Sequence, residues 1–321
     1  MRRGSASGTK CSLILILILI LILLIGGGVS PVFGDDEADT IESMQDTMDA
    51  GQRTLDLLME KFRPVVEEEA PELYRTEAVR VEAVADFNAF ANDSNKSIVV
   101  PLGFVAETFF QARALMQTYD ENLDPRLYQE YMKYLSERGL ESRKKGYSLG
   151  FNDFWLWAGI NKPCCINDQH DYQYRARLEG FMIDALAFPL AHEIGHVALR
   201  HKKYSDISPS VSRQQEHEAD KYALGLMSDT GLGIQASILT QLPRFDLAER
   251  SMEFPQNTKP THPSTACRIE FLTRDLFEQI ESDPQKKADF NGSSSMSIDE
   301  VRDYFYDVML ECESDDLYMP E

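Results

Sequence analysis

The chain has 321 residues, of which 43% are hydrophobic and 26% are charged, and its formal net charge at pH 7 is −21. This length suits one large domain or two small ones, and the composition is ordinary for a globular protein. The strong negative charge and the lack of a basic stripe argue against a nucleic-acid-binding protein.

The first 34 residues have the layout of an export signal. Three basic residues in MRRGSASGTK precede the 13-residue apolar run LILILILILILLI, and small residues occupy positions 32 and 34, just before a potential cleavage site. This order predicts a secretory signal peptide. Because the apolar stretch can be counted on through Phe33, an uncleaved anchor that holds the chain on a membrane is the alternative. We expect an exported protein, periplasmic or secreted if the signal is cleaved and otherwise membrane-anchored and facing the outside.

Export changes the interpretation of the cysteines. Beyond Cys11 in the targeting segment, the chain contains Cys164, Cys165, Cys267 and Cys312. In an oxidising compartment four cysteines can form two disulfides in three connectivities. A bond between adjacent cysteines is strained, so we expect the adjacent pair to bond to the other two, with free buried thiols as the alternative.

After residue 34, apolar spacing and helix-breaking residues predict a mostly helical chain. We expect a main domain at 35–281, with an insertion at about 120–175, and an acidic tail at 282–321 that contains one helix. In chain order the expected elements are a helix at 38–62 that ends at Pro64, a strand at 97–104, helices at 105–118 and 125–139, a loop-rich segment at 146–171, two helices flanking Pro189, and helices at 213–228, 264–281 and 298–312.

One of these helices carries the motif HEIGH, residues 192–196. Residues four apart lie on the same face of a helix, so His192 and His196 can bind one metal ion through their imidazole nitrogens. Glu193 lies about 100° around the helix from His192. Its carboxylate can therefore reach a water on the metal rather than the metal itself. This pattern predicts a zinc site with Glu193 as its general base.

A third ligand is available in the segment EHEAD, residues 216–220. Nineteen residues separate Glu216 from His196, and Asp220 lies one turn further along the same helix face. We expect Glu216 to be the third metal ligand and Asp220 to orient a ligand histidine. Two histidines and one glutamate leave a coordination position open, as in catalytic zinc sites with one ion per chain.

With these motifs the sequence resembles the minigluzincin metallopeptidases, typified by the CAAX prenyl protease, the heat-shock protease HtpX and the periplasmic protease BepA. Besides HEIGH, the resemblance rests on EHEAD, on FNAFANDSNKSIVVPLGF at 87–104 and on THPSTACRI at 261–269. It implies a zincin-like α+β domain, mostly helical, with a small sheet that carries a substrate-binding edge strand.

The spacing departs from that family. About 90 residues separate the expected edge strand from the HEIGH helix, and the 19-residue gap before Glu216 is shorter than the family usually shows. The Lit-type peptidases, which also pair HEIGH with a nearby ExEAD, are a more distant option. The ligand assignments are the same for both relatives.

The resemblance also implies roles for residues outside the metal motifs. Ile98 and Val100 would belong to the edge strand that binds an extended polypeptide substrate, and Asn88 would help to hold that strand. His262 would either bind the metal reversibly or stabilise the oxyanion of the transition state, with Arg268 nearby.

Two functions are compatible with these features. The first is an exported zinc endopeptidase that hydrolyses peptide bonds with a metal-activated water, acting in quality control of envelope proteins. The alternative is a latched, weakly active homologue that mainly binds or senses a partner protein.

Overall fold

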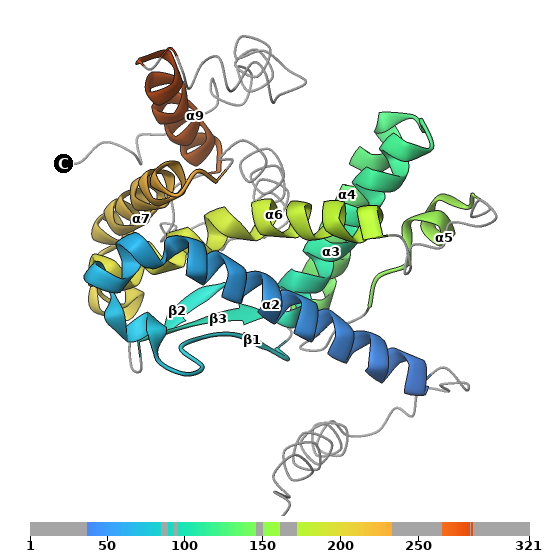
Figure 1. The fold of residues 1–321 in the computed structure, drawn as a ribbon, viewed down its shortest axis with the longest axis horizontal. Helices are drawn as coiled ribbons and strands as arrows, with labels where there is room; N and C mark the ends of the chain where they lie inside the picture. The colour runs from blue at the N-terminus through green and yellow to red at the C-terminus, as the bar shows by residue number, and fades with distance from the viewer. Residues whose placement is uncertain are drawn as a thin grey trace, which may run out of the picture. The chain divides into compact units, whose positions relative to one another are not determined.

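Figure 1 shows the fold in a computed structural model, which describes residues 37–84, 89–92, 96–145, 150–160, 172–232, 265–282 and 284. The chain divides into two units, Met1–Met44 and Gln45–Glu321, and the elements that position the candidate site belong to the second. In chain order the elements are α2 (Glu37–Glu69), η1 (Pro71–Tyr74), β1 (Val79–Glu82), β2 (Phe90–Asn92), β3 (Ser97–Pro101), α3 (Leu102–Asp120), α4 (Pro125–Lys145), α5 (Phe154–Ala158), α6 (Tyr172–Ala198), η2 (Tyr204–Asp206), α7 (Pro209–Asp229) and α9 (Thr265–Ser282).

The described part of the chain is mostly helical and contains one three-stranded sheet, an α+β arrangement. The predicted signal segment and the predicted helix at 298–312 lie outside the described residues. Among the helices that are described, none is both long and apolar enough to span a membrane.

The sheet has the strand order β1-β3-β2, with β1 parallel and β2 antiparallel to β3. All five residues of β3 are buried. The prediction that Ile98 and Val100 lie on an edge strand is therefore wrong, because β3 is paired on both sides. The strand is also shorter than predicted: Pro101 has an extended conformation and caps the N-terminus of α3, which starts at Leu102.

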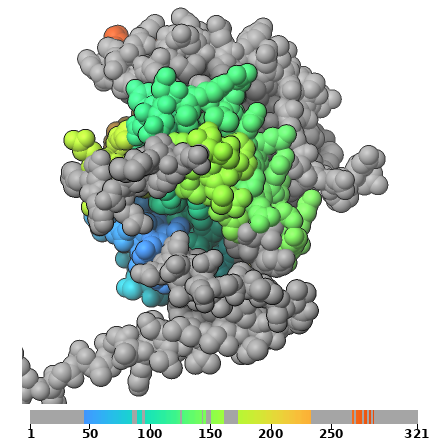
Figure 2. All heavy atoms as spheres, turned by 90° about the vertical axis from the view of Figure 1, so that its right-hand side faces the viewer, coloured from blue at the N-terminus to red at the C-terminus, as the bar shows by residue number. Residues whose placement is uncertain are grey.

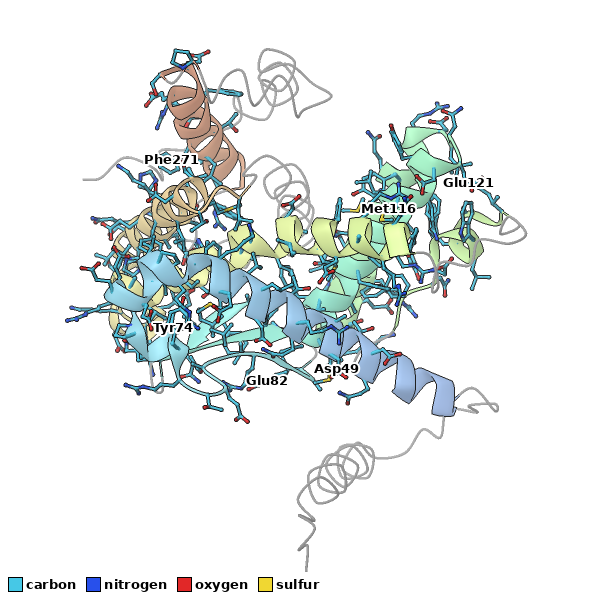
Figure 3. The ribbon with its side chains drawn as sticks, viewed as in Figure 1. Asp49, Tyr74, Glu82, Met116, Glu121 and Phe271 are labelled. Atoms are coloured by element: carbon cyan, nitrogen blue, oxygen red, sulfur yellow. The ribbon has the colours of Figure 1, made fainter. Side chains whose placement is uncertain are left out.

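The outer edge of β1 is closed by a side chain of α2. The Gln52 amide donates to the carbonyl oxygen of Val79 at 3.2 Å and accepts from the backbone N–H of Val81 at 2.9 Å. These bonds satisfy the backbone groups that an edge strand would otherwise offer to another strand. Further along, the Tyr74 hydroxyl of η1 donates to the Met59 carbonyl at 2.9 Å and so ties η1 to α2 (Figure 3).

Helix α2 continues through Pro64, where the sequence predicted its end. Proline removes one backbone hydrogen bond and disturbs the preceding turn. Phe62 and Val66, on either side of it, are fully buried in the main hydrophobic core. Burial of two large apolar side chains stabilises the helix by about 1.5–3 kcal/mol each, enough to offset a proline cost of about 3 kcal/mol.

Burial of apolar side chains also explains why α6 is one continuous helix, although two helices were predicted. Pro189 lies inside it, between Phe188 and Leu190, which are 2% and 1% exposed. Because these core-facing residues are deeply buried, the helix continues through Pro189 despite the backbone hydrogen bond that proline cannot make. Its continuity carries the chain unbroken into the HEIGH motif.

The segment predicted as loop-rich contains a short helix, α5, with its own aromatic core. Tyr131 of α4 is fully buried against Phe154 and Trp157, with ring centroids 5.3 and 5.1 Å away. Asp153 caps α5 by accepting from the backbone N–H of Trp155. Aromatic packing rather than apolar periodicity orders this part of the chain. In Figure 2 the green atoms lie on the face turned toward the viewer, beside the yellow-green atoms of α6.

Candidate metal centre

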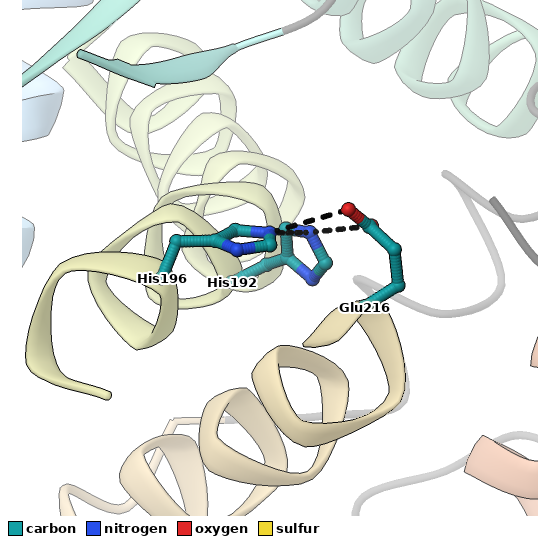
Figure 4. Close-up of side chains that lie close together, drawn as sticks. All are labelled: His192, His196 and Glu216. Carbon is teal, nitrogen blue, oxygen red and sulfur yellow. Dashed lines mark hydrogen bonds and ion pairs between the residues drawn. The ribbon is translucent and has the colours of Figure 1, made fainter. Parts of the chain in front are cut away.

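Three side chains from two neighbouring helices converge at one point (Figure 4). His192 and His196 project from α6, and Glu216 projects from α7. The two Nε2 atoms lie 3.1 Å apart, and the Glu216 carboxylate oxygens lie 3.3 Å from Nε2 of His192 and 3.5 Å from Nε2 of His196. The structure thus brings the three predicted ligands together as a group that could hold a metal ion.

These distances fit a tetrahedral ion. Zinc binds histidine nitrogen and carboxylate oxygen at about 2.0–2.2 Å, so neighbouring ligand atoms of a tetrahedral site lie about 3.4 Å apart. The observed separations of 3.1 to 3.5 Å bracket that value. Three ligands of this kind leave one position for a water or a substrate, as catalytic rather than structural sites do.

The approach of α7 to α6 depends on small residues. A Cβ placed on Gly195, inside the HEIGH motif, would lie 3.2 Å from the Cα and the carbonyl oxygen of Ala219. Ala219 and Ala223 are fully buried on the facing side of α7. Without these small side chains the helices would stand further apart, and Glu216 would not reach the two histidines.

Glu193 lies next to this group but takes no part in the triangle of ligand atoms. Its Oε2 accepts a hydrogen bond of 2.7 Å from the backbone N–H of Ala91 on β2. Burial raises the pKa of Glu193 to about 7. A carboxyl group with such a pKa can both accept and return a proton near neutral pH, which suits a general base.

His192 is oriented by a buried pair of opposite charges. Its Nδ1 lies 2.7 Å from Oδ1 of Asp220, and Arg268 of α9 donates to both oxygens of Asp220, at 2.6 and 2.9 Å. Burial disfavours the Asp220 carboxylate, but Arg268 and His192 outweigh burial and lower its pKa to about 2. Arg268 is therefore bound to Asp220 in this structure, whereas the resemblance placed it beside an oxyanion.

The two ligand histidines differ in proton affinity when no metal is bound. Burial opposes the charged form of His192, but Asp220 and Glu216 outweigh it and raise its pKa to about 10. Burial and the neighbouring charge of His192 lower the pKa of His196 to about 3. Without a metal, both ring nitrogens of His192 therefore carry a proton at neutral pH, and a metal ion that binds Nε2 must displace the proton there.

Two residues beside the triangle were not predicted from the sequence. A continued helix would have put His201 about 180° from His192, yet its Nδ1 lies 2.9 Å from Nδ1 of His196. The hydroxyl of Tyr204 in η2 donates to Oε1 of Glu216 at 3.4 Å. Both residues follow the end of α6, where the chain changes direction. Helical spacing therefore does not predict where their side chains lie.

The remaining predicted residues are not brought to the site. Asn88 and His262 lie outside the described residues, and so do Cys164, Cys165 and Cys312. Cys267, at the start of α9, is fully buried and disulfide-bonded. Because no other cysteine is among the described residues, the predicted connectivity stays a prediction.

Comparison with known proteins gives one family. Residues 151–287, less than half of the chain, match the model of the family described as Peptidase U49, the Lit-type peptidases. No curated protein and no solved structure matches the chain. The matched segment contains the three converging ligands, Glu193 and the Asp220–Arg268 pair. The match supports a peptidase, and its family is the Lit-type family, which the sequence analysis gave as the more distant option. It does not confirm the resemblance to the CAAX prenyl protease group.

Proposed function

We propose that this chain is a zinc-dependent endopeptidase with a zincin-like catalytic domain. The observation that carries the proposal is the triangle of His192, His196 and Glu216, whose spacing suits a tetrahedral ion with an open position. Two histidines and one glutamate with an open fourth position are one of the ligand sets of catalytic zinc sites. The match to a peptidase family supports the reaction class.

The residues of the chain divide the work of peptide hydrolysis. A zinc ion held by the triangle would polarise the scissile carbonyl and lower the pKa of a water. Glu193 accepts a proton from the attacking water and delivers it to the leaving nitrogen. The C–N bond then breaks with release of a neutral amine instead of an amide anion. Asp220 fixes the Nδ1–H form of His192, which leaves Nε2 free to bind metal.

We also assign the substrate-binding edge to β2 instead of β3. Successive backbone N–H groups of a strand point to opposite sides, and the N–H of Ala91 is bonded to Glu193, so it points away from β3. An extended peptide that pairs with β2 would take over this N–H and free Glu193 to accept a proton. Backbone pairing of this kind tolerates many side chains, which suits a polypeptide substrate of varied sequence.

Metal loading tests the proposal directly. We expect the purified protein to bind one zinc ion per chain and to cleave an unfolded model protein, and we expect chelation to abolish cleavage until zinc is restored. Because the ion displaces the proton of His192, whose pKa is raised, the apparent zinc affinity should increase by about tenfold per pH unit near neutrality. A protein that binds no zinc, or cleaves equally well without it, would contradict the proposal.

Export is a further part of the proposal, supported by the composition of residues 1–34 and by the disulfide-bonded Cys267. An exported peptidase would act on misfolded proteins of the envelope. N-terminal sequencing of the protein recovered from cell fractions is expected to give a chain that starts at Asp35 and lies outside the cytoplasm. A chain that retains Met1 in the cytoplasmic fraction would exclude export.

A further inference from the structure

The side chain of His201 is 6% exposed and lies against the ligand histidine His196, although the proposed reaction does not use it. The His196 and His201 ring centroids are 4.9 Å apart, and the rings meet edge to face at 75°. Nδ1 of His201 lies 2.9 Å from Nδ1 of His196, and Nε2 of His201 lies 3.2 Å from a carboxylate oxygen of Glu218. Glu218, His201 and His196 thus form a continuous series of hydrogen-bonded side chains that ends at the metal-binding triangle.

The backbone around His201 is fixed by several independent contacts. After α6 ends, Arg200 adopts a left-handed conformation (φ 56°), which non-glycine residues seldom do. This turn lets the backbone N–H of His201 donate to the carbonyl oxygen of His196 at 3.0 Å. The Gln215 amide then holds the next residue, Lys202, through its N–H and its carbonyl oxygen, each at 2.9 Å. These backbone and side-chain bonds fix the course of the chain after α6 and with it the position of His201.

Metal binding by Nε2 of His196 determines which nitrogens of His196 and His201 donate and which accept hydrogen bonds. If Nε2 of His196 binds a metal, its proton must be on Nδ1, and that N–H can only donate to Nδ1 of His201. His201 must then carry its own proton on Nε2, which donates to Glu218. Each nitrogen has one role, and no buried donor faces another donor.

We propose that His201, supported by Glu218, is a positioning residue that fixes the tautomer and the ring orientation of His196 and so sets the metal affinity. This inference rests on the proposed function. It gives the two ligand histidines different supports: a charged carboxylate, Asp220, for His192, and a neutral imidazole for His196. The neutral support holds the second ring without adding a further negative charge beside Glu216.

Metal affinity, measured by competition with a chelator, tests this role without reference to activity. We expect His201→Leu to bind zinc 10–100-fold more weakly than the parent protein, the range found when such supporting groups are removed. His201→Asn should retain most of the affinity, because the Asn carbonyl oxygen can take the place of Nδ1 as acceptor. The cobalt(II)-loaded proteins should show the same order, with an altered absorption spectrum for His201→Leu only.

Two further substitutions keep the test decisive should His201→Leu fail to fold. Glu218 is 45% exposed, so Glu218→Leu and Glu218→Gln should both fold. The Leu variant is expected to bind zinc several-fold more weakly, and the Gln variant, which keeps an acceptor, to resemble the parent. Asp229→Asn, at the exposed end of the same helix, is the matched control and should change nothing.

The outcomes separate this inference from the proposed function. A parent protein that binds no zinc refutes the proposed function and the inference with it. A parent protein that binds zinc tightly, with His201→Leu within twofold of it, refutes the inference alone. Equal losses in His201→Leu and His201→Asn would also overturn it, since they would show that the hydrogen bond has no part in the effect.

Discussion

Replacing Glu193 by glutamine should reduce peptide cleavage by about 10²–10⁴-fold while the protein still binds one zinc ion per chain. The amide cannot accept a proton from water, and general bases contribute about this factor to turnover. Metal binding should persist because Glu193 lies outside the triangle of ligand atoms. The amide oxygen can also keep the hydrogen bond from the N–H of Ala91, so the local structure should not change. Turnover of an unfolded protein and zinc content, measured on the same preparation, check both parts.

The pH profile gives the same prediction a second test. Burial raises the pKa of Glu193 to about 7, and the base works only when it is ionised. Activity should therefore rise with pH along an acidic limb at or below neutrality, since a bound cation moves the limb to lower pH. The residual activity of Glu193→Gln should lack this limb.

The cellular effect of Glu193→Gln distinguishes the two functions that the sequence allows. Loss of the phenotype together with loss of cleavage is expected for an endopeptidase. If the substitution abolishes cleavage but leaves the phenotype of the cell unchanged, the cellular role of the chain depends on binding a partner and not on cleavage.

Sequence spacing predicted the parts of the site that depend on one regular helix. The four-residue spacing of His192 and His196 fixes their common face. Ala219 and Ala223 indicate a helix that can come close enough for Glu216 to join them. His201 and Tyr204 could not be found this way. Their positions depend on the left-handed conformation of Arg200. Glycine usually signals such a conformation in a sequence, and an arginine does not.

The fold was predicted less well where tertiary burial outweighs local preference. Pro64 was predicted to end one helix and Pro189 to lie between two helices, but the buried side chains around them keep α2 and α6 continuous. The edge strand was assigned to β3 from the family resemblance of residues 87–104, and not from the pairing of the strands. Its antiparallel partner β2 has only three residues, too few for an alternating pattern to show, and only the pairing reveals which strand is at the edge.

Replacing Arg268 by leucine should have the largest effect on stability, about 3–5 kcal/mol, because it leaves a fully buried carboxylate without its main counter-charge. Asp220 is 0% exposed and accepts two hydrogen bonds from Arg268, at 2.6 and 2.9 Å. Chemical denaturation of the metal-free proteins measures the difference. Arg274→Leu is the matched control on the same helix: its pair with Glu270 is on the surface, and its loss should cost less than about 1 kcal/mol.

The pH dependence of this effect has a definite sign. The folded-state pKa of Asp220 is lowered to about 2, below its usual value near 4, so the ionised pair stabilises the fold above about pH 4. That contribution is lost as the pH falls from about 4 towards 2. Arg268→Leu should therefore be most destabilising near neutrality and should approach the parent protein in acid.

A double-mutant cycle separates the pair from simple loss of packing. Asp220→Leu leaves the Arg268 guanidinium buried without its partner, whereas the double leucine variant removes both charges and leaves an apolar contact between α7 and α9. The double variant should then be more stable than the sum of the single losses predicts, and it should also bind zinc more weakly, because His192 has lost its support. Additive losses in stability would show that Arg268 and Asp220 act independently, and unchanged zinc affinity would show that Asp220 does not orient the ligand.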